Sequence, residues 1–160
     1  MSPKKILYVC TGNSCRSVMA QEYLRHVLKR AGAVQMLVES AGVFAIQGMS
    51  ATRETLRVVQ EAGIMPSDHH ARLLTPEMIR DADLIFTMEA FQTEEVVRRE
   101  PSAKGKAHLL KLYQAPVGDA PLNPNIADPI GKPLEVYEVC FTEVREAVDR
   151  VAKSLGVPSV

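Results

Sequence analysis

Apolar residues along this chain form two kinds of pattern that follow one another. Short apolar runs, typical of strands buried on both faces, lie at 6–9, 36–38 and 84–86, with a weaker one at 107–110. Apolar residues at helical spacing predict helices over 20–31, 55–62 and 137–155. Thr75-Pro76-Glu77 has the cap residue and the proline of a further helix start. Strands that alternate with helices predict a parallel sheet with helices on both faces.

Length and composition narrow the class of protein. The chain has 160 residues, of which 46% are hydrophobic and 24% charged, and it contains no internal repeat or linker. We therefore expect a single three-layer α/β domain over residues 1–160. Nineteen basic residues balance nineteen acidic ones, so no broad positive surface favours nucleic acid or an anionic membrane. Any anion must be bound by a local site.

The apolar runs and the cysteines indicate where in the cell the protein is expected. No apolar run approaches the about 20 residues that a membrane-spanning helix needs, and the first apolar stretch is too short for a signal peptide. Three cysteines form no disulfide framework and fit a reducing compartment. We expect a cytoplasmic protein that does not bind membranes.

The loop after the first strand holds the candidate chemistry, because ligands of such folds bind beyond the carboxyl ends of the strands. This loop reads Cys10-Thr11-Gly12-Asn13-Ser14-Cys15-Arg16-Ser17. Five residues separate Cys10 from Arg16, enough to wrap around one tetrahedral anion with backbone N–H groups pointing inward. The helix that follows adds positive potential at its N-terminus. We expect Gly12 to supply a conformation that a side chain would hinder and Asn13 to hold the loop in shape.

Each polar member of this loop has a possible chemical role. The positive environment stabilises a thiolate at Cys10, the nucleophilic form, and Ser17 can donate a hydrogen bond to it. Arg16 can bind two phosphoryl oxygens at once. A lone cysteine is more often a buried apolar side chain. The spacing to Arg16 and the strand–loop–helix position favour a catalytic phosphate site instead.

Cleavage of a phosphate ester also needs a proton for the departing oxygen. Asp128-Pro129 is the candidate, within a segment from 114 to 133 that holds five of the ten prolines. Pro129 restricts the backbone beside Asp128 and so limits where the carboxyl group points. Taken alone, Asp-Pro is also a common turn pair.

The loop from 10 to 17, with Asp128-Pro129 far downstream, resembles the low-molecular-weight protein tyrosine phosphatase family. Ser40-Ala41-Gly42 and Thr87-Met88 also look like segments of that family. The resemblance implies a four-stranded parallel α/β domain that needs no metal or other cofactor. It implies phosphorylated proteins as substrates, and inorganic phosphate as product and inhibitor. Cys10 would form a cysteinyl-phosphate, Arg16 would stabilise the transition state, and Asp128 would act as acid and then as base.

The resemblance also assigns supporting roles. Substrate and phosphate binding would fall to the rest of the loop, namely Thr11, Gly12, Asn13, Ser14, Cys15 and Ser17. Ser40 and His69 would belong to a supporting hydrogen-bond network. For His69, a surface histidine beside His70 is the alternative.

Two features bear on the substrate. Tyrosine-specific members often carry aromatic residues after Asp-Pro, where this chain has Ile130-Gly131, and a bulky aliphatic residue at the position of Ser14. Members that act on phosphoarginine carry a small hydroxyl residue there, and the run 40–44 also resembles their branch. Phe44 is either a wall of the substrate pocket or an apolar anchor of its loop. Phosphotyrosine and phosphoarginine both remain candidate substrates.

Two other functions compete with phosphatase activity. Arsenate reductases of the same fold have a similar loop, including a serine at position 14, but need two further cysteines near the end of the third strand. Residues 87–92 contain no cysteine, and Cys140 lies on the last predicted helix. The other alternative is a phosphate-binding module without turnover. The combination of Cys10, Arg16 and Asp128 argues against it.

Overall fold

The computed structural model describes residues 3–118 and 121–158. Four parallel strands form one sheet in the order β2-β1-β3-β4 within these residues. The central strand is β1, and Tyr8 on it pairs with Ser40 on one side and Phe86 on the other. The predicted four-stranded parallel sheet is confirmed. The strands are β1 (Lys5–Cys10), β2 (Leu37–Gly42), β3 (Leu84–Thr87) and β4 (Ala107–Leu109).

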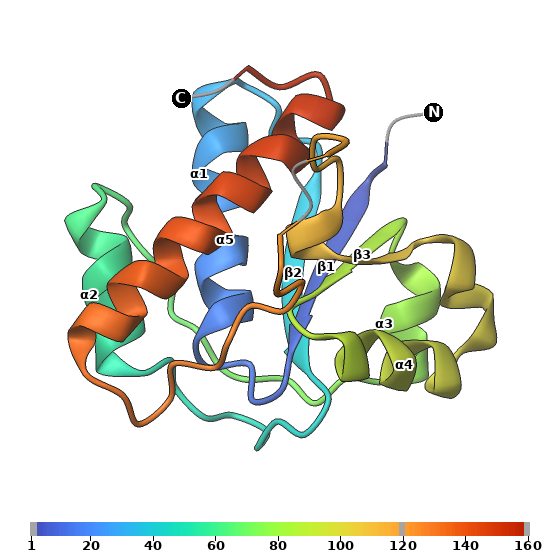
Figure 1. Ribbon diagram of the computed structural model, residues 1–160, viewed down its shortest axis with the longest axis horizontal. Coiled ribbons are helices and arrows are strands. Elements are labelled where there is room, and N and C mark those ends of the chain that lie inside the picture. The colour runs from blue at the N-terminus through green and yellow to red at the C-terminus, as the bar shows by residue number, and fades with distance from the viewer. Residues whose placement is uncertain (1–2, 119–120, 159–160) are drawn as a thin grey trace.

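Helices cover both faces of this sheet (Figure 1). One face is covered by α1 (Arg16–Arg30) and α5 (Leu134–Ser154), and α2 (Arg53–Glu61) packs against these two helices. The other face packs against α3 (Pro76–Asp81) and α4 (Ala90–Arg99). Two short 3-10 helices, η1 (Pro101–Gly105) and η2 (Leu110–Leu112), flank β4.

One helix, α4, was not predicted from the sequence. Its buried positions are occupied by only Gln92 and Val96, so its inner face is not marked by a repeat of apolar residues. In α5 the buried face is mainly apolar, and the pattern predicted that helix from Tyr137 onward, three residues after its observed start.

The alternation of side chains along β1 places the nucleophile candidate. Ile6, Tyr8 and Cys10 belong to the core beneath α1 and α5, whereas Leu7 and Val9 belong to the core beneath α3 and α4. The strand ends at Cys10, and the chain then turns into α1 at Arg16. The loop between them therefore lies at the carboxyl end of the central strand.

A close approach of two loops shapes this edge of the sheet. A Cβ atom on Gly42 would lie 2.5 Å from the Thr11 carbonyl oxygen and 2.9 Å from the Asn13 nitrogen. Beyond Gly42, the Val43 and Phe44 N–H groups donate to the carbonyl oxygens of Cys10 (3.0 Å) and Thr11 (2.9 Å). Only glycine at position 42 lets the chain after β2 lie this close to the nucleophile loop.

Within the described ranges, no helix is both long and apolar enough to cross a membrane. Over those same ranges no group of three or more His, Cys, Asp or Glu side chains is placed to hold a metal ion.

The close approach gives a test of the fold around the loop. We expect Gly42→Ala to lower the free energy of unfolding by about 1–3 kcal/mol, because the methyl group must displace backbone atoms. It should also weaken phosphate binding, since the displaced atoms belong to Thr11 and Asn13. Urea denaturation and a phosphate titration measure the two effects.

Gly105→Ala is the matched control. No atom lies within 4 Å of a Cβ built on Gly105, and its φ is not positive. Its stability should stay within about 0.5 kcal/mol of wild type. Equal stabilities for the two variants would contradict the close approach at Gly42.

Candidate active site

Hydrogen bonds to the Cys10 sulfur define the centre of the site. The sulfur lies 2.9 Å from the Ser17 hydroxyl and accepts from the Asn13 N–H at 3.2 Å. The Asn13 side-chain amide donates to the Ser17 oxygen at 2.8 Å. Because this N–H fills an acceptor position of the hydroxyl, the Ser17 hydrogen is free to point at the sulfur. Both contacts favour a negatively charged sulfur.

Asn13 holds the loop in an uncommon backbone conformation. Its φ is 53°, in the left-handed region. Its side-chain oxygen accepts from the Arg72 backbone N–H at 2.9 Å, and its carbonyl oxygen lies 2.7 Å from Nε2 of His69. Since a backbone N–H can only donate, the Arg72 contact fixes which end of the Asn13 amide faces Ser17.

The expectation that Gly12 supplies the special conformation was wrong. Gly12 has no positive φ, and a Cβ there would lie 3.6 Å from the Ser14 hydroxyl, an ordinary contact. The left-handed conformation falls on Asn13 because an asparagine tolerates it and because the side chain is held at both ends.

His69 is part of the loop support and not a free surface histidine. Burial lowers its pKa, and the hydrogen bond to Asn13 offsets only part of this effect. A neutral ring must carry its proton on Nε2 here, because a carbonyl oxygen only accepts. Ser40, expected in the same network, donates its hydroxyl to the Gln21 side chain at 2.8 Å. It therefore supports the loop only through other residues.

Arg16 is the buried cation of the site, with 1% of its surface exposed. Its Nη1 donates to Glu89 at 2.8 Å and to the Ile126 carbonyl at 2.6 Å, and its Nη2 lies 3.6 Å from the Asp128 carboxylate. Burial lowers the pKa of Arg16, but Cys10, Glu89 and Asp128 together raise it above its ordinary value. The side chain is therefore permanently charged.

One buried nitrogen of the Arg16 guanidinium group, Nε, forms no hydrogen bond to the described residues. A buried polar group without a partner costs about 1–3 kcal/mol. An anion oxygen bound beside Cys10 is the kind of acceptor that would complete it. The helix behind Arg16 has no side-chain cap at Cys15 in the described part of the chain, so its first N–H groups also remain for an anion.

Glu89 and Gln92 belong to this site, and the sequence analysis did not find them. Gln92 is buried; its oxygen accepts from the Met88 and Glu89 N–H groups, and its nitrogen donates to the Thr11 hydroxyl at 3.0 Å. The start of α4 thereby positions both the Glu89 carboxylate and the nucleophile loop. The available signal was a glutamate followed by a glutamine three residues later, which is typical of a helix start.

The segment that carries Asp128 is tied to the same cation. Ile126 is buried, and its N–H donates to the Met88 carbonyl at 2.8 Å while its own carbonyl accepts from Arg16. Two residues on, the Asp128 carboxylate accepts from the Ile130 N–H at 3.1 Å and is 38% exposed. The acid candidate thus lies beside Arg16 and faces solvent. Residues 119 and 120 of this proline-rich segment lie outside the described residues.

The remaining loop candidates divide into buried and exposed positions. Ser14 is 8% exposed, and its hydroxyl lies 3.7 Å from the Cys15 sulfur. The Cys15 sulfur also contacts the hydroxyls of Thr52 and Tyr137, each at 3.6 Å. Phe44 is 62% exposed, so it is not a buried anchor, and its backbone is bonded to Thr11. Its exposure is compatible with the predicted place at the substrate pocket, which stays a prediction.

A cysteine and an arginine on an anion-binding loop, with a carboxylate beside them, are typical of cysteine-dependent phosphatases. The sequence model of the family described as low molecular weight phosphotyrosine protein phosphatase matches residues 5–158. The chain belongs to this family. It is a phosphatase that acts on phosphotyrosine or phosphoarginine.

Individual relatives agree with this assignment. The protein-arginine-phosphatase of Geobacillus stearothermophilus is 38% identical over 96% of this chain and 97% of its own length. The crystal structure of the Erwinia amylovora tyrosine phosphatase AmsI has a TM-score of 0.83 and 32% identity, covering 96% of this chain and 93% of that one. The tyrosine phosphatase Wzb from Escherichia coli K30, solved in complex with phosphate, has a TM-score of 0.79 and 29% identity, covering 98% and 100%.

The ion pair between Glu89 and Arg16 gives a test of the site. Glu89→Gln keeps an acceptor but replaces a charged hydrogen bond by a neutral one, a difference of about 1–1.5 kcal/mol. We expect kcat/KM on an aryl phosphate to fall about tenfold. Because glutamine still offers Arg16 an acceptor and the Ile126 carbonyl and Asp128 remain beside the guanidinium group, thermal stability should change less than activity.

Glu94→Gln, on the exposed side of the same helix, is the matched control. It should leave kcat/KM within about twofold of wild type. A Glu89→Gln enzyme as active as this control would mean that Glu89 does not position Arg16.

Proposed function

We propose that this chain hydrolyses phosphoarginine in proteins at least as well as phosphotyrosine. Ser14, a small hydroxyl residue in the phosphate loop, carries the proposal. The similarity to an arginine phosphatase of Geobacillus stearothermophilus supports it, although tyrosine phosphatases are also among the relatives. Cys10, Arg16 and Asp128 perform the chemistry, and the other loop residues bind the phosphoryl group.

In the first step the Cys10 thiolate attacks phosphorus from the side opposite the leaving group. A sulfur–phosphorus bond forms while the bond from phosphorus to the substrate oxygen or nitrogen breaks. Nε and Nη2 of Arg16 and the loop N–H groups hold the three other phosphoryl oxygens. Asp128 gives its proton to the departing atom, so the leaving group departs neutral if it is a phenol.

In the second step water resolves the cysteinyl-phosphate. The Asp128 carboxylate, now without its proton, takes one from a water molecule as the water oxygen attacks phosphorus. The sulfur–phosphorus bond breaks, which restores the Cys10 thiolate and releases inorganic phosphate. Since phosphate then occupies the site that the substrate needs, it is an inhibitor as well as a product.

The choice between the two substrates depends on the entrance of the site. A bulky aliphatic side chain at position 14 would pack against a flat phenol ring and crowd a guanidinium group. Ser14 leaves room and offers an oxygen that can accept a guanidinium N–H, and the exposed Asp128 carboxylate can accept another. Ile130, which is 54% exposed, offers no aromatic face to a phenol.

Arsenate reduction is disfavoured because residues 87–92 contain no relay cysteine and Cys140, on α5, is buried. Burial raises the pKa of Cys140 to about 12, with smaller contributions from neighbouring groups. A thiol that remains protonated at neutral pH is a poor nucleophile toward a disulfide. We also propose a cytoplasmic location, because the mechanism needs Cys10 reduced.

Asp128→Asn tests the acid role. The amide cannot donate a carboxyl proton, so hydrolysis should slow by about 10²–10⁴-fold for substrates with poor leaving groups. Aryl phosphates with strongly activated leaving groups should lose much less. Rates for a series of aryl phosphates, plotted against leaving-group pKa, give the slope for each enzyme. Parallel slopes for wild type and variant would mean that Asp128 is structural.

Ser14→Ile tests the substrate. Loss of one hydrogen bond to a buried donor costs about 1–3 kcal/mol, which moves selectivity about tenfold or more. We expect wild type to cleave a phosphoarginine peptide at least as efficiently as the matched phosphotyrosine peptide, and Ser14→Ile to shift the ratio of kcat/KM values toward phosphotyrosine. Ser14→Thr keeps the hydroxyl and is the control. A strong phosphotyrosine preference in wild type, unchanged by isoleucine, would sink the proposal.

A further inference from the structure

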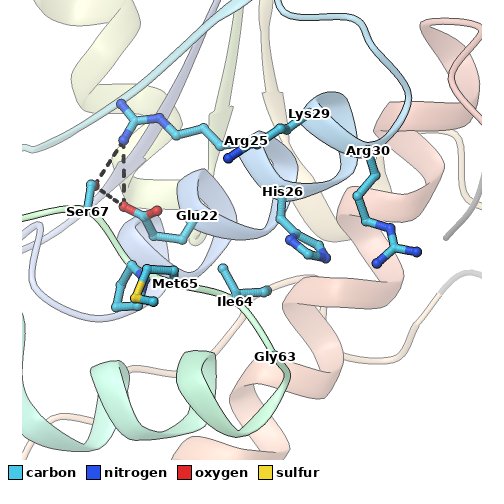
Figure 2. Close-up of a pocket in the computed structure, with 10 residues that line it drawn as sticks. Glu22, Arg25, His26, Lys29, Arg30, Gly63, Ile64, Met65 and Ser67 are labelled. Atoms are coloured by element: carbon cyan, nitrogen blue, oxygen red, sulfur yellow. Dashed lines mark hydrogen bonds and ion pairs between the residues drawn. The ribbon is translucent and has the colours of Figure 1, made fainter.

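A second cleft lies between α1 and the chain that follows α2 (Figure 2). One wall is formed by the last turns of α1, and the other by residues 63–67. Its volume is about 750 Å³, within the range of clefts that bind small molecules. Arg16, the first residue of α1, belongs to the phosphate site. At 1.5 Å per residue, Lys29 and Arg30 lie roughly 20 Å farther along the same helix.

The helix wall of this cleft is positively charged. Arg25, Lys29 and Arg30 are its basic residues, and Figure 2 shows His26 on the same helix, directed toward Ile64. Lys29 and Arg30 are exposed and form no ion pair in the ranges that the structure describes. These two cations are therefore available to a ligand.

Among the described residues that line the cleft, the one carboxylate is Glu22, and it does not neutralise these cations. Glu22 is 4% exposed and is occupied by its own contacts. It accepts hydrogen bonds from the Ser67 hydroxyl and from the Gln21 amide, and it lies 3.6 Å from Arg25. Arg25 in turn donates to the Val38 carbonyl and to Ser67. Glu22 and Arg25 therefore compensate each other within the cleft.

The titration of His26 agrees with an excess of positive charge. Its pKa is lowered first by burial and then by Arg30, Arg145 and Lys29. These three basic residues therefore lie near enough to His26 to disfavour its charged form.

The opposite wall is apolar. Ile64, Met65 and Pro66 line it, and Met65 is 90% exposed although it has a large apolar side chain. Basic residues in the last turn of a helix do stabilise its dipole, which accounts for Lys29 and Arg30 as helix residues. That stabilisation does not account for an apolar wall facing them across a cleft. A ligand with an anionic group and an apolar body would contact both walls.

We propose that this cleft binds a small organic phosphate, separate from the substrate of the phosphatase site. The phosphate dianion would contact Lys29, Arg30 and His26, and the apolar part would lie against Ile64 and Met65. Two cations that lack carboxylate partners suit a doubly charged group.

The probe is 1-naphthylphosphonate, a dianion with a flat apolar body and a phosphorus–carbon bond that the enzyme cannot hydrolyse. Titration into the wild-type protein is followed by the NMR shifts of its backbone amides, which separate the two sites. We expect one set of shifts at residues 10–17 and a second, with its own dissociation constant, at residues 25–30 and 63–67. Inorganic phosphate, which lacks the apolar part, should bind the second site at least about tenfold more weakly, a difference of about 1.4 kcal/mol.

The double variant Lys29→Gln/Arg30→Gln should weaken binding at the second site at least tenfold and leave the first site unchanged. Lys104→Gln/Lys153→Gln removes the same charge from exposed positions elsewhere and is the control. Shifts confined to residues 10–17, or equal affinities in the two double variants, would overturn the proposal. So would a phosphoserine peptide that binds residues 25–30 more tightly than the phosphonate does, since that would assign the cleft to a protein ligand.

Discussion

The candidate phosphate site depends on the left-handed backbone of Asn13. A non-glycine residue pays roughly 1–2 kcal/mol for that conformation, and here its polar groups are held from three directions. Arg72 and His69 bind its side-chain oxygen and its carbonyl, while its amide binds Ser17. With Asn13 fixed, its N–H and the Ser17 hydroxyl both converge on the Cys10 sulfur. The geometry of the nucleophile is therefore set by a segment that lies almost sixty residues away in the sequence.

Arg16 has an equally wide structural role. Its guanidinium group joins the start of α4, through Glu89, to the segment that carries Asp128, through the Ile126 carbonyl. The group that is proposed to bind phosphate thus also sets the spacing of the loops around it. A buried cation is tolerable only because these acceptors replace its lost water. The segment 63–72 also connects two regions. Its first residues form one wall of the second cleft, and His69 and Arg72 form hydrogen bonds to Asn13.

The elements that the sequence predicted are those whose buried faces consist of apolar side chains. The apolar run 6–9 and the spacing along 137–155 revealed β1 and most of α5 because burial of apolar side chains alone defines them. The buried face of α4 includes Gln92, which donates a hydrogen bond to Thr11, so no apolar pattern indicated this helix. Glu89 was missed for a related reason. A glutamate before a helix looks like any helix start until the fold brings Arg16 beside it.

The two carboxylates around Arg16 bear on how quickly the enzyme can repeat its cycle. Glu89 and Asp128 already share much of the guanidinium charge before any anion enters. An arginine without these two carboxylate partners would bind inorganic phosphate more tightly. Release of phosphate would then limit the rate of each turnover. Here a bound phosphate shares Arg16 with the Glu89 carboxylate, and in the proposed mechanism Asp128 becomes a second negative neighbour once it loses the proton that it took from water. The same arrangement that orients the cation therefore limits how much of its charge is available to a bound phosphate.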